Sequence, residues 1–369
     1  MNHIAILLTV FNRKEKTIKC LRNITAQSLP ADTKFDIYIV DGGSTDGTVE
    51  SVKTQFPHVN IKTVDGVFWN RGMIEAWKMA EEKKRNGCNY DYYLWLNDDT
   101  FIYKDCIASL LRVSLLKKNR TIVLGSTVDT QTRSKLTYGG RDKTGKVARP
   151  SSDDSPVPVI MMNGNIVLVP HSVYKKLGTL DPYYTHARGD FDYGLRARKA
   201  GIELWQVGHP LGECDAHEHI DAWCDPEIPL KKRWKLMYRP NGMPPMEIFH
   251  LENRHYGFCI ALQHYFTIHL RCIWPNLWIK AGKANINKLH QGGGRIEYID
   301  LAKGFCIILV VLFHCDIYFY HIGYEFNTMV GNTFRMPLYY FLSGLFFKPY
   351  NGFFNFAIRK ANKLLIPFF

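Results

Sequence analysis

Three groups of acidic residues stand where strands are expected to end or helices to begin. The first is Asn97, Asp98 and Asp99, directly after the apolar and aromatic run "YYLWL". Carboxylate and amide oxygens are the hard ligands that Mg²⁺ and Mn²⁺ prefer, and a cation held there would neutralise charge that develops on a diphosphate. An Asx-turn that closes the strand explains the same triplet equally well.

The second group surrounds Asp41 in "IVDGGSTDGT", residues 39–48. Asp41 ends a strand-like run, Gly42 and Gly43 permit a tight turn, and the Ser, Thr and Asp that follow are helix-capping types. A carboxylate at a strand end can accept hydrogen bonds from a nucleobase edge or a ribose hydroxyl. A turn with a good N-cap explains Asp46 by itself and leaves Asp41 less well explained.

The third group is Asp190 and Asp192 in "ARGDFDYGLRARKAG", residues 187–201. Both stand at an expected helix start, where the helix dipole favours negative charge. A carboxylate in that position that faces a cleft can act as a general base on a hydroxyl. Simple N-capping is an equally good interpretation of the pair.

The elements that must position these acids alternate along the chain. Strand-like runs are separated by helix-like stretches, which predicts βαβ units and a mostly parallel sheet flanked by helices. Ligands of such α/β sheets bind at the carboxyl ends of the strands, where the acids lie. The expected strands are 4–10, 35–41, 60–66, 90–98 and 121–128, and the expected helices are 13–27, 47–56, 71–85 and 104–118.

The next part of the chain is less regular. Residues 135–158 are rich in Gly, Ser, Pro and Asp, which predicts a hairpin and a loop. A strand at 159–169, a helix at 192–200 ended by Gly201, a strand at 202–208 and one long amphipathic helix at 246–273 are expected after it.

Composition indicates a membrane partner. The formal net charge is +13, and basic residues concentrate between Lys231 and Lys303, next to a very apolar C-terminal part. That placement favours the cytoplasmic side of a membrane over nucleic acid. The nine cysteines show no zinc-like spacing, and no signal peptide follows Met1, so we expect reduced thiols and an N-terminal part that stays in the cytosol.

Two apolar runs follow the glycine-rich linker "HQGGG", residues 290–294. The runs 304–320 and 336–347 are marginal in length for membrane-spanning helices, which need about 17–25 residues. We expect a C-terminal α-helical membrane segment, with buried helices of a soluble domain as the alternative.

Five motifs occur in a fixed order: "LLTVFNRKEKTIKCL", "IVDGGSTDGT", "FWNRGMIEAW", "LWLNDDT" and "GDFDYGLRARKAG". From about Ile4 to Pro275 the chain therefore resembles glycosyltransferase family 2, whose members have the Rossmann-like GT-A fold for nucleotide sugars. The resemblance implies an inverting transfer of a sugar from a nucleoside-diphosphate sugar, helped by Mn²⁺ or Mg²⁺. It also implies these roles: Thr9, Asp41, Asn70, Arg71, Asn97 and Asp98 near the nucleotide, with Asp41 at its base; Asp99 as metal ligand; Asp190 as catalytic base; and Asp192 in reserve.

Two positions depart from the pattern of that family. Asn97 replaces the first acid of the DxD-like motif, which would weaken metal binding, and Gly189 stands where many members carry a glutamate. His186, His217 and His219 are candidates for a further metal ligand, although a lone histidine is more often a surface or packing residue.

Residues 295–369 resemble the start of the membrane acyltransferase 3 family, with Lys303 and His314 at the positions of its first-helix arginine and histidine. An ionisable residue in a membrane helix is by default a functional hypothesis. The chain reaches Phe369 after about two spanning segments, so we expect an incomplete acyltransferase domain: part of a fusion, a disrupted gene, or a remnant that serves as an anchor.

The sequence thus predicts a glycosyltransferase domain at 1–275, a basic glycine-rich linker at 276–294 and an incomplete acyltransferase-like segment at 295–369. Its expected partners are a nucleotide-sugar donor, a glycan or lipid-linked acceptor in surface polysaccharide synthesis, and the cytoplasmic face of the cell membrane, without nucleic acid. Two alternatives stay open. One is a non-catalytic module that binds nucleotide sugar or glycan, and the other is O-acyl transfer to sugars through His314.

Overall fold

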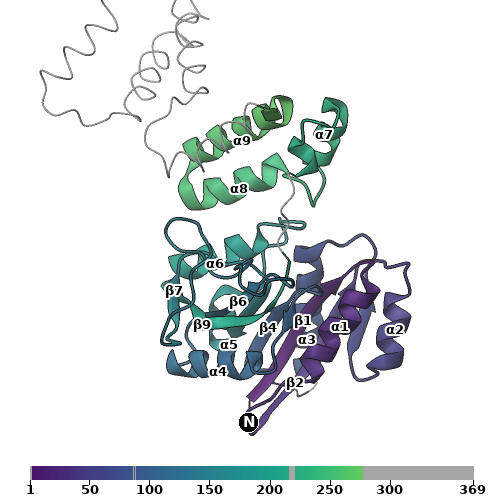
Figure 1. Ribbon diagram of the computed structural model, residues 1–369, viewed down its shortest axis with the longest axis vertical. Helices are drawn as coiled ribbons and strands as arrows, with labels where there is room; N and C mark the ends of the chain where they lie inside the picture. Colours follow the sequence, from purple (N-terminus) through teal and green to yellow (C-terminus); the bar gives the residue numbers. More distant parts are fainter. Residues whose placement is uncertain (1, 86, 88, 216–220, 277–369) are drawn as a thin grey trace, which may run out of the picture. The chain divides into compact units, whose positions relative to one another are not determined.

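The computed structural model describes residues 2–85, 87, 89–215 and 221–276 (Figure 1). Met1–Ile273 forms one compact unit. No helix among the described residues has the length and apolar character needed to cross a bilayer. The predictions for His217, His219, Lys303, His314 and the apolar runs 304–320 and 336–347 lie outside the described residues.

A single nine-stranded sheet runs through the described part of the unit, in the order β3-β2-β1-β4-β8-β6-β9-β5, with β7 paired to β9. Strands β1 and β2 pair along their whole lengths, so that Val10 is opposite Asp41 at their carboxyl ends. The strands are β1 (Asn2–Val10), β2 (Thr33–Asp41), β3 (Asn60–Thr63), β4 (Tyr92–Leu96), β5 (Phe101–Ile102), β6 (Ile122–Val128), β7 (Val157–Val159), β8 (Ile166–Pro170) and β9 (Leu204–Glu213).

The sheet is mixed, and the prediction of a mostly parallel sheet is wrong in this respect. The block β3-β2-β1-β4 is parallel, as is β6 with β9, but β8 runs antiparallel to both β4 and β6. The physical reason lies in the connection. Parallel neighbours need a long crossover, usually a helix, whereas β6 and β8 are joined through irregular chain and β7 without any helix.

Helices cover both faces of this sheet (Figure 1). Alternate residues of β1 explain the two layers, because Ile4, Ile6 and Leu8 pack with α1, α2 and α4, while Ala5 and Leu7 pack with α3, α5 and α6. The helices are α1 (Lys14–Thr25), α2 (Thr48–Gln55), α3 (Trp69–Arg85), α4 (Cys106–Leu116), α5 (His171–Leu177), α6 (Gly189–Lys199), α7 (Leu230–Met237), α8 (Pro245–Tyr256) and α9 (Phe258–Ile273), with a short 3-10 turn at Ala222–Cys224.

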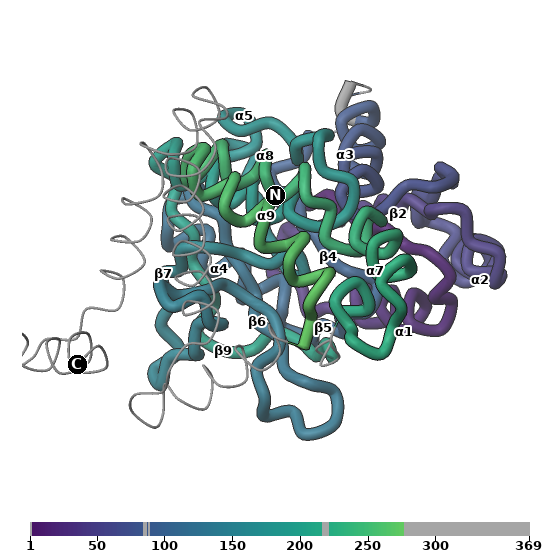
Figure 2. Tube along the Cα trace, turned by 90° about the horizontal axis from the view of Figure 1, so that it is seen from above, coloured from purple at the N-terminus to yellow at the C-terminus, as the bar shows by residue number. Residues whose placement is uncertain are grey.

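The long helix and the strand before α5 are among the elements that differ from their predicted bounds. The long helix expected at 246–273 is divided at Gly257, whose φ of 98° ends α8 and starts α9 in a new direction. The strand expected at 159–169 is regular only from Ile166, and residues 160–165 form a loop before β8. Helices α8 and α9 pack against each other (Figures 1 and 2), and α8 contacts the α/β layers through Leu251, Tyr184 and Leu195.

Candidate active site

A cavity of about 530 Å³ opens at the carboxyl ends of β1 and β4. Its walls also include the loop before β8, the chain that leads into α6, and Asn241 from the segment between α7 and α8. Of the residues predicted from sequence, six line it: Thr9, Asn97, Asp98, Asp99, His186 and Asp190. The structure therefore brings together acids that are about 90 residues apart in the sequence, as expected for strand ends of an α/β sheet.

The three residues after β4 have different partners. The amide oxygen of Asn97 accepts a hydrogen bond from Trp69 Nε1 at 2.8 Å. Asp98 is almost fully buried, and its second carboxylate oxygen accepts a 3.4 Å hydrogen bond from Thr17 Oγ1. Asp99 retains 17% exposure of its side chain at the cavity wall. The amide oxygen of Asn97 is thus already bonded to Trp69 in the cavity wall, while the carboxylates of Asp98 and Asp99 can contact a cation.

A guanidinium group already sits between those carboxylates. Arg13 Nη1 lies 3.1 Å from Asp98 Oδ1 and 2.8 Å from Asp99 Oδ2. Burial raises the pKa of Asp98 to about 6, with Arg13 acting in the opposite direction. Burial by itself would lower the pKa of Arg13, but the two carboxylates outweigh it and raise that pKa. The carboxylates of Asp98 and Asp99 therefore form a strong site for a positively charged group.

Asp190 occupies the first turn of α6 with one side toward the cavity. Its oxygens accept the backbone N–H groups of Gly164 at 2.9 Å and Phe191 at 2.8 Å. Burial raises the pKa of the Asp190 carboxyl above its ordinary value, although these two hydrogen bonds and the nearby Arg188 act to lower it. A buried, oriented carboxylate with raised pKa is suited to accept a proton.

Asp192 lies two residues further on, fully buried and outside the cavity lining. It accepts hydrogen bonds from Arg196 Nε at 2.7 Å, Arg254 Nη1 at 2.9 Å and His255 Nε2 at 2.9 Å. Burial by itself raises its pKa, but these donors outweigh burial and lower the pKa. The carboxylate predicted as a reserve base instead ties α8 to α6.

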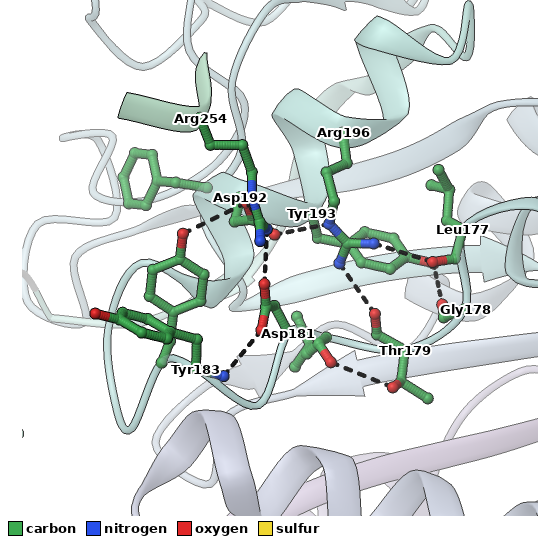
Figure 3. Close-up of polar contacts among 12 residues, drawn as sticks. Leu177, Gly178, Thr179, Asp181, Tyr183, Asp192, Tyr193, Arg196 and Arg254 are labelled. Carbon is green, nitrogen blue, oxygen red and sulfur yellow. Dashed lines mark hydrogen bonds and ion pairs between the residues drawn. The ribbon is translucent and has the colours of Figure 1, made fainter. Parts of the chain in front are cut away.

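Arg254 extends this network to the loop before α6. Its Nη1 also lies 2.6 Å from Asp181 Oδ2, so that one guanidinium joins two carboxylates (Figure 3). Arg196 donates in addition to the carbonyls of Leu177 and Thr179, both at 3.0 Å. Helix α6, and Asp190 with it, is thereby tied to α8 and to the chain at residues 177–181.

Three further predicted residues lie outside the cavity lining. Asp41 is fully buried, and its carboxylate accepts the backbone N–H groups of Gly43 and Ser44 at 3.0–3.2 Å, which closes the turn after β2. Arg71 is exposed on α3. Asn70 is fully buried and donates to the carbonyls of Asp181 and Tyr184 at 2.9 and 2.8 Å. Contacts of these three residues with a nucleotide stay predictions.

Asn70 explains the departure at Gly189. A Cβ added to Gly189 would lie 1.7 Å from Asn70 Oδ1, closer than any real contact. The glutamate that many relatives carry at this position therefore cannot enter while Asn70 fills the space. The two positions have to be considered together, because the side chain on α3 takes the volume that the residue before Asp190 would need.

Sequence reasoning missed the aromatic wall of the cavity. Trp69 and Phe68 line it together with Phe191, and the Trp69 ring is so close to Gly164 that a Cβ there would lie 2.6 Å from its Cζ2 atom. Sugar rings commonly pack on aromatic faces because their C–H groups are apolar. The sequence contains a signal for this wall, because Phe68 and Trp69 directly precede Asn70 in the motif "FWNRGMIEAW". Sequence analysis assigned roles only to Asn70 and Arg71 of this motif.

His186 lines the same wall but is poorly suited as a metal ligand. Its Nδ1 accepts the backbone N–H of Trp69 at 3.4 Å, and burial, reinforced by Arg13, lowers its pKa. A neutral ring with Nδ1 as acceptor carries its proton on Nε2. His186 therefore presents a hydrogen-bond donor and no second lone pair.

The divalent cation implied by the sequence resemblance fits the residues present. Within the described ranges, no three His, Cys, Asp or Glu side chains are grouped to hold a metal by themselves. Mg²⁺, however, commonly uses one or two carboxylates and completes its shell with substrate phosphate oxygens and water. Asp98 and Asp99, with a guanidinium already between them, match that donor set.

Two family models match parts of this chain. The family model described as glycosyl transferase family 2 matches residues 5–162, and the one described as acyltransferase domain matches residues 296–369. Residues 5–162 are therefore similar to family 2 glycosyl transferases. Both resemblances predicted from the sequence are confirmed, and the described part has the α/β, GT-A-like architecture of a mixed sheet flanked by helices.

Solved structures include chains with a similar path. S. aureus TarS 1-349 in complex with UDP-GlcNAc is 13% identical, over 71% of this chain and 72% of that chain, with a TM-score of 0.45. The mannosyltransferase PcManGT from Pyrobaculum calidifontis, in complex with GDP-Man and Mn²⁺, is 17% identical, over 83% of this chain and 80% of that chain, with a TM-score of 0.41. No curated protein matches the chain.

Proposed function

We propose that this glycosyl transferase domain transfers a sugar, with inversion, from a nucleoside-diphosphate sugar to a hydroxyl of a glycan or lipid-linked acceptor. The observation that carries the proposal is the cavity itself, which has a buried carboxylate of raised pKa on one wall and a carboxylate pair for positive charge on another. A single displacement needs both a base for the acceptor and a site for the diphosphate.

The residues of the chain divide these tasks. Asp190, oriented by two backbone N–H groups, accepts the proton of the acceptor hydroxyl as its oxygen attacks the anomeric carbon. The sugar ring packs against Trp69, whose position is fixed by its bond to Asn97. His186 offers an N–H group to the nucleotide sugar as a hydrogen-bond donor. Asp98 and Asp99 would hold a divalent cation, which would supply charge neutralisation for the leaving diphosphate.

We also propose that the protein works at the cytoplasmic face of a membrane. Helix α9 supports this, because Leu262, Phe266 and Leu270 recur every four residues on one side and are 37%, 57% and 44% exposed. Its opposite side is buried against α8 and α7 through Ala261 and Cys272, so the helix is apolar on both sides. The neighbouring α7 exposes three lysines that suit anionic headgroups: Lys231, Lys232 and Lys235.

The two alternatives differ in how they stand against the structure. A module that only binds nucleotide sugar needs no oriented base, whereas Asp190 is held at the cavity by two hydrogen bonds. Acyl transfer through His314 concerns residues 296–369, which match the acyltransferase domain and lie outside the described residues. This alternative therefore concerns another segment of the chain, and the geometry of the cavity does not bear on it.

A donor screen tests the proposed function. Purified full-length protein is given a panel of nucleoside-diphosphate sugars with an acceptor extract, and release of nucleoside diphosphate is measured with Mn²⁺ or with a chelator. We expect release from one donor, loss of it with the chelator, and loss of it in Asp99→Ala. Release that Asp99→Ala leaves unchanged would refute the metal site, and no release from any donor would refute transferase activity.

A further inference from the structure

The positive charge between Asp98 and Asp99 is the guanidinium of Arg13. This side chain can move away from the two carboxylates. One nitrogen, Arg13 Nη1, contacts both carboxylates, and the Arg13 side chain is 43% exposed at the cavity. The carboxylate side chains are only 6% and 17% exposed. Asp98 is further held by Thr17. The two carboxylates are thus the more buried partners, and the guanidinium is the more exposed one.

The backbone beneath Arg13 is held firmly by contacts that do not involve its side chain. Asn12 N donates to Ser44 Oγ at 2.8 Å, and Asn12 Oδ1 accepts the backbone N–H of Thr45 at 2.8 Å. The Arg13 carbonyl accepts the N–H of Thr17 at 2.9 Å within the first turn of α1. A change of partner therefore requires only rotation of a long side chain, which occurs in picoseconds to nanoseconds for exposed residues.

We propose that Arg13 holds the place of a divalent cation between Asp98 and Asp99, and passes to the diphosphate when cation and nucleotide-sugar donor bind. This inference rests on the proposed function, because it takes the diphosphate of a nucleotide sugar as the second partner. Its consequence is that the binding of the cation and the binding of the diphosphate are coupled through one side chain.

Charge is the reason for the exchange. A divalent cation and a guanidinium that share two carboxylates repel each other at short range, so Arg13 must be displaced before the cation is fully bound. A diphosphate offers Arg13 a replacement, because the planar fork of guanidinium matches phosphate oxygens with two parallel hydrogen bonds. Either ligand therefore raises the affinity for the other, and linkage requires the two effects to be equal.

A permanent ion pair is the competing interpretation, and the two make opposite predictions for the cation alone. If Arg13 competes for the carboxylates, removing its charge makes Mn²⁺ bind more tightly without any nucleotide. If Arg13 only orients Asp98 and Asp99 as ligands, its removal loosens the site and makes Mn²⁺ bind more weakly. The sign of one affinity change separates the two.

The test measures binding of Mn²⁺ alone, by electron paramagnetic resonance, and of inorganic diphosphate alone, by calorimetry, to full-length protein. We expect Arg13→Gln to bind Mn²⁺ about tenfold more tightly than the wild type and inorganic diphosphate about tenfold more weakly. Arg13→Lys keeps the charge and should stay within about threefold of the wild type for Mn²⁺. Arg22→Gln, the same change on the exposed side of α1 where Arg22 contacts Gln55, is the matched control and should alter neither affinity.

Four results would overturn the proposal: unchanged or weaker Mn²⁺ binding in Arg13→Gln, no Mn²⁺ binding by any of the proteins, Arg13→Lys behaving as Arg13→Gln, or the same shifts in Arg22→Gln. Arg13→Met, which keeps the aliphatic stem, replaces Arg13→Gln if that variant does not melt cooperatively. Failure of the proposed function is distinguishable, because it would appear as absent sugar transfer by the wild type and leave the comparison of Mn²⁺ affinities intact.

Discussion

Asp190 and Asp192 are separated by one residue at the start of α6 and belong to different parts of the molecule. Asp190 lines the cavity and accepts two backbone N–H groups, whereas Asp192 is fully buried and accepts hydrogen bonds from Arg196, Arg254 and His255. A helix turns by about 200° over two residues, so positions i and i+2 face opposite ways. One acid is placed for chemistry and the other for holding α8 to α6.

Replacing Asp192 should therefore affect folding first. Asp192→Asn removes the charge that balances Arg196 and Arg254 inside the protein, and breaking a buried ion pair from one side costs roughly 3 kcal/mol or more. We expect a lowered melting temperature, measured by calorimetry on the full chain. Asp190→Asn, the matched change two residues away, should leave the melting temperature close to that of the wild type. Equal destabilisation by both variants would contradict the division of roles.

The pH dependence of turnover should reflect Asp190. A base works as the carboxylate, and burial raises the pKa of Asp190, so activity is full above this raised pKa and is lost as pH falls through it. The acid limb of kcat/KM should lie at higher pH than the value of about 4 for an ordinary aspartate. A profile that stays flat down to about pH 4 would show that another group accepts the proton.

Gly189 and Asn70 should behave as a coupled pair. In Gly189→Ala the new Cβ meets Asn70 Oδ1, so we expect lower stability and lower turnover through displacement of the first turn of α6. Asn70→Ala removes the obstacle but loses two hydrogen bonds to the 181–184 loop. The double variant should therefore be less damaged than the sum of the single variants, as a double-mutant cycle of melting temperatures will show. Simple additivity would mean that the close contact is relieved in another way.

The exposed side of α9 should contact lipid. A photo-crosslinking amino acid at Phe266 in the full-length protein, in membranes that contain anionic lipid, should give protein–lipid adducts by mass spectrometry. The same amino acid at Leu115, which is 55% exposed on α4, is the control and should give few. A cross-linked dimer at Phe266 would contradict the contact with lipid. It would show that this surface binds a second copy of the chain.

The parts of the fold that the sequence predicted are those set by local pattern. The apolar runs predicted as strands at 4–10 and 35–41 match β1 and β2 to within two residues at either end. The reason is that the pattern of apolar residues along a strand is visible in the local sequence. The antiparallel entry of β8 was missed because it depends on a connection through irregular chain, whose path no periodicity encodes. The short strands β5 and β7, which run antiparallel to β9, add to the mixed character of the sheet.

For the site, residue types were predictable and partners were not. The acids at 97–99 and at Asp190 were found from strand ends and helix starts, but Arg13 reaches Asp98 across 85 residues of sequence. That contact exists only because β1 and β4 are neighbours in the sheet. Asp190 and Asp192 are both N-cap candidates in the sequence, and their opposite orientation was not predicted; it follows from their spacing of two residues on one helix.

The most direct test of the account is the rate of sugar transfer by Asp190→Asn compared with the wild type, using the donor found in the screen and measured beside donor affinity. A general base contributes about 10²–10⁴-fold, so we expect turnover to fall by about a thousandfold with donor affinity and melting temperature nearly unchanged. Turnover within about threefold of the wild type would contradict the assignment of Asp190 as the base and with it the proposed mechanism.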